Sequence, residues 1–292
     1  MNIEHIVLSG GGPVGFIQCS SINYLLNKNM IDLNKIKSIY AVSAGIFTAI
    51  AIALKYDFND IVKYQVERPW EKIFEIKPSN AIYNIITKNG IYDNESFENI
   101  ISPILLAKDI NISITLIELY EKTNVDLHII TTNINTLEMV DINHISHPDY
   151  KLLEIIHMTC CIPLLFTPIF KDDTFFLDGG ITNNFPLDLC IKNNNLDNTD
   201  TILAYKNLID TNYYNGLKSD SQLVDIIMFL IKKLACMLCY KNQSTVKYIV
   251  NIPTPGMSYN TLIKLLNKDD RSKLMKDGVD YTKLFLEYHK LF

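Results

Sequence analysis

The 292-residue chain is poor in arginine, and its charge balance is slightly acidic. Arg68 and Arg271 are its only arginines, and 27 basic residues stand against 32 acidic ones, for a formal net charge of −5. Proteins that bind nucleic acids usually present a basic patch and arginines that read base edges. A nucleic-acid partner is therefore not expected.

The chain also lacks a long apolar run and a leader peptide pattern. Residues 1–5 show neither a charged region nor the apolar stretch of a signal peptide. The longest apolar run, Ile46 to Leu54, is too short for a membrane-spanning helix, which needs about 20 residues. The sequence therefore predicts a protein that is cytoplasmic or peripheral at membranes. With 48% hydrophobic residues, the chain can bury a large core.

The six cysteines form no dense framework. Cys236 and Cys239 make a C-x-x-C pair inside an apolar helical pattern, but no second pair or histidine lies near it. Zinc sites of this kind need four ligands at characteristic spacings. We expect these cysteines to be buried and reduced, and we expect no metal site.

Strand and helix patterns alternate at the start of the chain. Residues 3–8 form an apolar run that leads into a glycine-rich loop, and apolar residues then recur at helical spacing. A second short apolar run, residues 36–42, leads into the helical pattern of residues 46–54. Two successive strand–loop–helix units predict a parallel sheet covered by helices.

Further along the chain, the pattern predicts strands at residues 125–132, 138–142, 174–177 and 202–205. After Lys206 the sequence changes to polar loops and amphipathic helices. We expect this last region to pack on the sheet, although amphipathic helices also suit docking on lipid.

Ser43 lies between the second predicted strand and its helix, in the turn Ala41-Val42-Ser43-Ala44-Gly45. A serine on such a sharp turn presents its hydroxyl at the edge of the sheet, where a substrate carbonyl can reach it. The small residues Ala41, Ala44 and Gly45 let the strand and the helix pack closely. The usual pattern is G-x-S-x-G, and Ala41 replaces its first glycine. Taken alone, this pattern also suits an ordinary turn.

The glycine loop allows two interpretations. Gly10, Gly12 and Gly15 fit G-x-G-x-x-G, which is typical of dinucleotide-binding folds. That function needs an acidic residue at the end of the second strand, where Val42 and Ser43 stand. The other interpretation is that backbone N–H groups of the loop bind an anion.

In this second interpretation, Gly11 and Gly12 donate hydrogen bonds to the oxyanion that forms when Ser43 attacks an ester. The two parallel strands must then be neighbours, so that the loop lies beside the serine. Pro13 has no N–H group and cannot contribute.

Asp178 is the best candidate for the base that a serine nucleophile needs. None of the six histidines stands in a loop after a predicted strand in a useful context. Asp178 ends a predicted strand, and Gly179 and Gly180 allow a tight turn that holds its side chain at the edge of the sheet. Taken alone, D-G-G also suits a plain turn.

Taken together, these motifs resemble those of the patatin-like phospholipases. They are Ser9–Gly15 (SGGGPVG), Ala41–Gly45 (AVSAG) and Asp178–Gly180 (DGG). Two further segments resemble the family as well, Cys160–Pro168 (CCIPLLFTP) and Leu177–Pro186 (LDGGITNNFP).

The resemblance covers residues 3–205 and implies a three-layer α/β/α fold with a mostly parallel sheet. It implies a patatin-like catalytic domain at residues 1–205, with residues 206–292 as a C-terminal helical region, and hydrolysis of lipid acyl esters by a phospholipase A-type reaction. Ser43 would be the nucleophile and Asp178 the base. Gly10, Gly11 and Gly12 would form the oxyanion hole, supported by Gly15, Ala41, Ala44, Gly45, Gly179 and Gly180.

The same resemblance implies no metal, organic cofactor or nucleotide, and a lipid or membrane surface as the partner. Two positions depart from the family pattern. Ala41 replaces a glycine of the turn, and Val14 stands where family members often carry a cation. Low activity is therefore an alternative, as is a lipid-binding protein of the same fold without catalysis. A dinucleotide-binding protein that uses Gly10, Gly12 and Gly15 is the third hypothesis.

Overall fold

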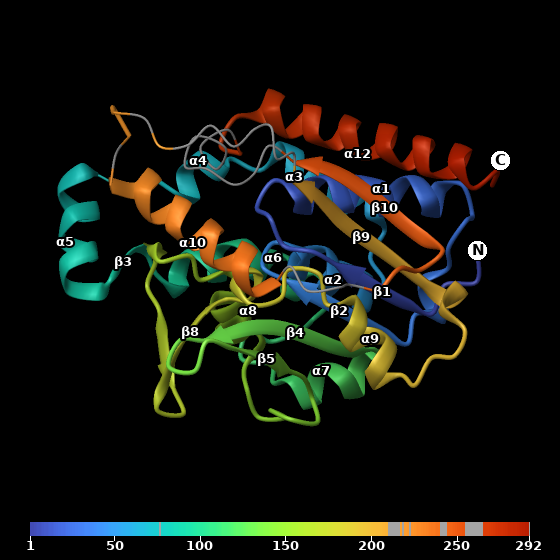
Figure 1. Cartoon of the computed structure of the whole chain (residues 1–292), viewed down its shortest axis with the longest axis horizontal. Coiled ribbons are helices and arrows are strands. Elements are labelled where there is room, and N and C mark those ends of the chain that lie inside the picture. The colour runs from blue at the N-terminus through green and yellow to red at the C-terminus, as the bar shows by residue number, and fades with distance from the viewer. Residues whose placement is uncertain are drawn as a thin grey trace.

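The computed structural model describes residues 1–75, 77–209, 217, 219–221, 223–239, 244–254 and 265–291. An eight-stranded sheet runs through the molecule in the order β10–β9–β1–β2–β4–β8–β7, with β5 also paired to β4 (Figure 1). A separate pair, β3 and β6, lies outside it. The strands are β1 (His5–Leu8), β2 (Ser38–Val42), β3 (Gly90–Tyr92), β4 (Asp126–Asn133), β5 (Glu138–Ile142), β6 (Leu164–Phe166), β7 (Ile169–Lys171), β8 (Thr174–Asp178), β9 (Ile202–Ile209) and β10 (Tyr248–Thr254).

The sheet is mostly parallel, as the alternating strand and helix patterns predict. Strands β10, β9, β1, β2 and β4 run parallel to one another, whereas β5 and β8 pair with β4 in the antiparallel direction. All residues of β1 and β2 are buried. This is the burial expected of parallel strands that have helices on both faces.

The helices of the described residues differ in length. They are α1 (Val14–Asn27), α2 (Gly45–Ala53), α3 (Phe58–Glu67), α4 (Trp70–Ile73), α5 (Pro78–Lys88), α6 (Asn94–Leu106), α7 (Leu116–Thr123), α8 (Leu152–Cys160), α9 (Leu187–Asn193), α10 (Leu223–Cys239) and α12 (Lys268–Tyr288).

Alternate strand residues divide the core between the two faces of the sheet. Ile6 and Ile39 belong to the main core, which also contains apolar residues of α1 and α2. Val7 and Tyr40 point the other way and pack against Leu187 of α9. Because successive side chains of a strand point to opposite faces, helices lie on both sides of the sheet. The three-layer α/β/α prediction is confirmed.

The segment after Lys206 contains a strand that the sequence patterns did not predict. β10 pairs with β9 and forms one edge of the sheet, and it carries Pro253. A proline inside an apolar run argues against a central strand but is tolerated at an edge. The helices expected after Lys206 are confirmed in α10, which precedes β10, and α12, which follows it. Helix α12 lies along α1 (Figure 1).

Within the described residues, no helix combines the length and the apolar character needed to cross a membrane. α10 is the most apolar of the long helices, but it has 17 residues.

Candidate active site

Ser43 occupies a strained turn between β2 and α2. Its φ angle is 50°, a left-handed conformation that is uncommon for residues other than glycine. Its N–H donates to Thr159 Oγ1 at 2.9 Å, and that hydroxyl donates to the carbonyl of Ile130 at 2.7 Å. Because strained backbone persists only where its surroundings fix it, α8 and β4 together hold the turn.

Asp178 lies next to Ser43 because β8 and β2, the strands that precede these two residues or end with them, both pair with β4. Strand β2 pairs with β4 as far as Val42 opposite Ile130, and antiparallel β8 ends with Asp178 opposite the next residue, Thr131. The two strands therefore flank β4 and end at adjacent positions along it, which brings Ser43 and Asp178 together. The sequence motifs place Asp178 and Ser43 at the same edge, but they do not predict that β8 runs antiparallel to its neighbour.

The hydroxyl of Ser43 donates a hydrogen bond to Asp178 Oδ2 at 2.6 Å. The other carboxylate oxygen of Asp178, Oδ1, accepts the N–H of Gly180 at 2.7 Å. Both side chains are buried, with exposed fractions of 5% for Ser43 and 6% for Asp178. Burial raises the pKa of Asp178 to about 6, although its hydrogen bonds from Ser43 and Gly180 act in the opposite direction. A carboxylate with such a pKa is suited to accept and return a proton near neutral pH.

All six histidines belong to the described part of the chain, and none hydrogen-bonds to Ser43 or Asp178. His128, for example, lies between the carboxylates of Asp126 and Asp141. His157 is buried beside Phe97, and burial lowers its pKa to about 4. The geometry therefore leaves Asp178 as the group that contacts the serine hydroxyl.

Two asparagines fix the glycine loop. Gly10 N–H donates to Asn184 Oδ1 at 3.1 Å, and the Gly10 carbonyl accepts hydrogen bonds from Asn184 Nδ2 at 3.3 Å and Asn207 Nδ2 at 2.6 Å. The amide of Gly10 is thus already used inside the protein, which argues against its expected role as an oxyanion donor. Gly11 and Gly12 follow with φ angles of 142° and 54°, and Gly12 lines the same cavity as Ser43.

Asn184, Asn207 and Thr159 are residues of the site that were not predicted from the sequence. Asn184 lies in the N-x-P segment that resembles the family, so a signal for it existed. Asn207 and Thr159 carry no local signal, because only the folded chain brings them to the loop and the turn.

The remaining motif residues lie where strands and helices approach closely. Ala41 is fully buried in β2, and Gly45 begins α2 after Ala44. Gly15, in the first turn of α1, faces the carbonyl of Ala44. A Cβ atom on Gly179 would lie 2.1 Å from the carbonyl oxygen of Ile130, so a side chain there cannot be accommodated. Val14, which replaces the family's frequent cation, is buried in the main core.

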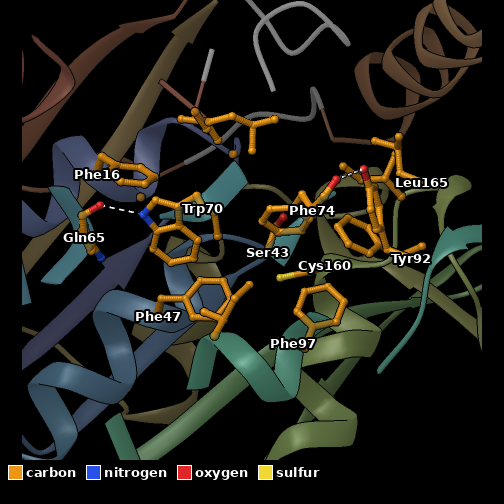
Figure 2. A pocket seen from close by; sticks show the side chains of 18 of the residues that line it. Phe16, Ser43, Phe47, Gln65, Trp70, Phe74, Tyr92, Phe97, Cys160 and Leu165 are labelled. Carbon is orange, nitrogen blue, oxygen red and sulfur yellow. Dashed lines mark hydrogen bonds between the residues drawn. The ribbon is translucent and has the colours of Figure 1, made fainter. Parts of the chain in front are cut away.

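A cavity of about 420 Å³ adjoins Ser43 (Figure 2). Its wall is mostly aromatic and aliphatic, and much of it comes from residues 64–104, which the sequence analysis did not connect with the site. Its size is within the range of small-molecule sites. The lining residues include Phe16, Phe47, Tyr64, Gln65, Trp70, Phe74, Tyr92, Phe97, Ile100, Ile104, Cys160, Ile162, Leu165 and Phe166.

Serine hydrolases of the α/β class also place a serine on a strained strand-to-helix turn, and apolar cavities of this size are typical of sites for apolar ligands. The family model described as Patatin-like phospholipase matches residues 6–191. The chain therefore belongs to the patatin-like phospholipase family, whose members act on lipid substrates.

Two viral proteins are similar in sequence. "Probable lipid hydrolase 463L" of Invertebrate iridescent virus 6 is 29% identical over 215 residues, which are 70% of this chain and 70% of that protein. An uncharacterized protein of Acanthamoeba polyphaga mimivirus is 29% identical over 188 residues, 64% of this chain and 61% of its own length. Family and relatives support a lipid hydrolase function.

Among solved structures, VipD from Legionella pneumophila has a similar fold. The TM-score is 0.57 at 17% sequence identity, and the match covers 99% of this chain and 67% of VipD. This similarity extends over β10 and α12 as well as the region that the family model matches.

Proposed function

We propose that this protein hydrolyses carboxylic esters of lipids, in a phospholipase A-type reaction, with a Ser43–Asp178 dyad. The observation that carries the proposal is the 2.6 Å hydrogen bond from Ser43 Oγ to Asp178 Oδ2, on a strained turn beside an apolar cavity. A nucleophile and a base within hydrogen-bond reach are the geometric requirement for acyl transfer.

In the first step, Ser43 Oγ attacks the ester carbonyl while its proton passes to Asp178 Oδ2. The carbonyl oxygen becomes an oxyanion, for which the N–H groups of Gly11 and Gly12 are the proposed donors, aided by the N-terminus of α1. Gly10 is left out of this set because its N–H donates to Asn184.

The tetrahedral intermediate then collapses, the bond to the alcohol oxygen breaks, and Asp178 returns the proton to the leaving alcohol. Water next attacks the acyl-serine, with Asp178 again accepting a proton. The bond between Ser43 Oγ and the acyl carbon then breaks, Asp178 returns the proton to Ser43 Oγ, and the fatty acid leaves. The raised pKa of Asp178 suits both roles, because a group that titrates near the working pH can accept and donate the proton. The cycle uses no metal or organic cofactor.

We propose that a lipid surface reaches the cavity over the end of the molecule that carries α5 and α10. Ile231 on the inner side of α10 packs against Ile162 and Leu165, which line the cavity. The outer side of α10 leaves large apolar side chains exposed, among them Leu230 and Met237. This part of the proposal follows the expectation that amphipathic helices after Lys206 also suit docking on lipid.

Helix α5 extends this apolar surface. It connects Phe74 to Tyr92, two residues of the cavity wall, and none of its own residues is buried. Ile82, Tyr83 and Ile86 are exposed on it. Figure 1 shows α5 and α10 at the same end of the molecule. Aliphatic and aromatic side chains of this kind insert into the interface of a bilayer.

The decisive experiment is intact mass measurement after reaction with a fluorophosphonate, in the presence of detergent. We expect one adduct on the wild type, none on Ser43→Ala, and slow formation on Asp178→Asn. Ser96→Ala is the matched control, because Ser96 is also a buried serine but lies on α6. An unmodified, folded wild type would contradict the proposal and favour a lipid-binding protein without catalysis.

A further inference from the structure

The segment just before α12 forms part of the cavity wall. Leu265 and Leu266 are partly exposed, and both line the cavity that adjoins Ser43. They lie beyond residues 6–191, the part of the chain that matches the family model. The C-terminal region therefore supplies apolar surface to a cavity that the family match alone does not describe.

Arg271, in the first turn of α12, holds this segment in place. The residue is 2% exposed, and its Nη1 donates to the carbonyls of Leu265 at 2.8 Å and Leu266 at 2.9 Å. Nε and Nη2 both donate to the carbonyl of Val66, at 3.2 and 2.8 Å, and Nη2 also donates to that of Arg68 at 3.0 Å. A guanidinium carries five N–H groups, so its whole donor capacity is used on these backbone carbonyls.

These hydrogen bonds join the segment to a second part of the cavity wall. Val66 follows Gln65 in α3, and the Arg68 carbonyl also accepts the N–H of Trp70 at 2.9 Å. Gln65 and Trp70 both line the cavity, and Figure 2 shows them on one side of Ser43. Because one guanidinium bonds to both segments, the two leucines belong to this side of the cavity.

The other side of the cavity lies next to the proposed lipid surface. Figure 2 shows Tyr92 and Leu165 across Ser43 from Trp70. Ile231 of α10 packs on Leu165, and Tyr92 ends the strand that follows α5. An acyl chain whose ester carbon lies at Ser43, and whose head group stays at the lipid surface, therefore extends toward Trp70 and the two leucines.

We propose that Leu265 and Leu266 are specificity-determining residues that limit the length of the acyl chain, and that Arg271 is the positioning residue that holds them. This inference rests on the proposed function, in which the cavity takes the acyl chain of a lipid. Each methylene that becomes buried should tighten binding about fourfold. The gain should stop at the chain length that reaches the two leucines.

The test measures binding of fatty acids to Ser43→Ala protein, so that no turnover is needed. The ligands are the even-numbered saturated acids from hexanoate to hexadecanoate, each below its micelle concentration. Trp70 is the single tryptophan of the chain and lines the cavity, so its fluorescence reports occupancy. We expect the affinity to rise with chain length and then to reach a plateau.

Adding Leu265→Ala and Leu266→Ala should move the plateau to chains about two to four carbons longer, because each substitution frees the space of an isopropyl group. Leu274→Ala is the matched control. Leu274 is also partly buried and packs on the main core from α12, but it does not line the cavity. It should leave the plateau where it is.

Arg271→Lys should weaken the binding of the longest acids about tenfold more than that of hexanoate, because a wall that is no longer fixed buries the end of the chain less fully. A purely structural role would lower the melting temperature without changing this ratio. Lys268→Met is the control: Lys268 pairs with Glu67 at 2.5 Å and joins the same two elements at the surface. It should leave the ratio unchanged.

The inference is overturned if the plateau of the double leucine variant matches that of the Ser43→Ala parent, or if no fatty acid binds. The leucine variants decide it even where Arg271→Lys does not fold, which thermal unfolding establishes. These outcomes are separate from those of the fluorophosphonate experiment. A serine that forms no adduct leaves the length profile intact, and an active serine with an unmoved plateau overturns only the role of the two leucines.

Discussion

The site beside the N-terminal end of α1 and the packing of α1 on α12 contrast in how well they follow the rules of stable folding. At its N-terminal end, Ser43 has a strained backbone, and the carboxyl group of Asp178 is buried without a cation among the described residues. Along its side, α1 packs on α12, and buried hydroxyl groups bond to one another there: Thr282 donates to Ser21 at 2.5 Å, and Ser21 bonds to the hydroxyl of Tyr205 at 2.9 Å. Local violations thus gather where chemistry is proposed.

Two buried ionic groups sharpen the contrast. The guanidinium of Arg271 donates to the backbone carbonyls of Val66, Arg68, Leu265 and Leu266, and so joins the start of α12 to the end of α3. Asp178 has two hydrogen-bond donors, Ser43 and Gly180, and its pKa is raised. A buried charged group whose hydrogen bonds are all made stabilises the fold, whereas a buried group with few hydrogen-bond partners has a shifted pKa that suits proton transfer.

The largest effect should come from Asp178→Asn, which we expect to lower activity and to raise stability. Loss of the base should lower ester hydrolysis by about 10³-fold. The neutral amide removes a buried charge but can still contact Ser43 and Gly180, so the free energy of unfolding at pH 8 should rise by about 1–3 kcal/mol. Activity on a soluble short-chain ester and urea denaturation measure the two. A variant that is both inactive and less stable would show that the carboxylate is structural.

Where α1 packs on α12, Gly278→Val should destabilise the protein without changing the rate at which the folded protein hydrolyses esters. A Cβ atom at Gly278 would lie 2.1 Å from Ser20 Oγ and 2.4 Å from the carbonyl of Ile17, so α1 and α12 must separate. We expect a loss of about 3 kcal/mol in the free energy of unfolding, with kcat of the folded fraction unchanged. Lys276→Val on the exposed side of α12 is the control for helix propensity and should cost about 0.5 kcal/mol.

The pH dependence should follow from Asp178 in a defined direction. Its pKa in the folded state, about 6, lies above the ordinary value of 3.8, so the folded state favours the protonated form. Activity needs the ionised base, so kcat/KM should fall about tenfold per pH unit below pH 6. For stability, the cost of burying the charge is absent below pH 3.8 and develops as pH rises to 6.

The stability advantage of Asp178→Asn should therefore shrink between pH 8 and pH 4. Urea denaturation of both proteins across this range measures it. An advantage that stays constant with pH would assign the effect to packing and not to the charge.

Much of the fold could be predicted because its signals are local. The glycine loop, the turn at Ser43 and the D-G-G turn each follow a strand in the sequence, and the structure brings these segments together. β10 was missed because an edge strand with a proline resembles a loop. The direction of β8 was missed because strand direction depends on pairing with β4, which no local pattern encodes.

The candidate site was predicted less completely. The motifs indicated Ser43 and Asp178, which contact each other, but not the residues that fix the turn and the glycine loop. Asn207 and Thr159 are ordinary polar residues in the sequence, and they matter because folding places them at Gly10 and Ser43. The cavity wall was also missed, since aromatic residues at helical spacing predict a core as readily as a binding site.

The smallest expected effect concerns the lipid surface proposed for α5 and α10. Ile86→Asn removes an apolar side chain that is 76% exposed, and it should lower hydrolysis of phosphatidylcholine vesicles about fivefold, because one less apolar group inserts into the bilayer. Hydrolysis of a soluble short-chain ester should stay unchanged, since a monomeric substrate needs no surface. Ile145→Asn is the matched control, because Ile145 has the same exposed fraction but lies between β5 and α8.

Flotation of the Ser43→Ala protein with the same vesicles separates binding from turnover. The Ile86 variant should float less than the Ile145 variant. Equal flotation and equal vesicle hydrolysis would contradict the docking surface while leaving the dyad untouched. A dimer in solution that dissociates on Ile86→Asn would instead assign this face to a second copy of the chain, and light scattering distinguishes that outcome.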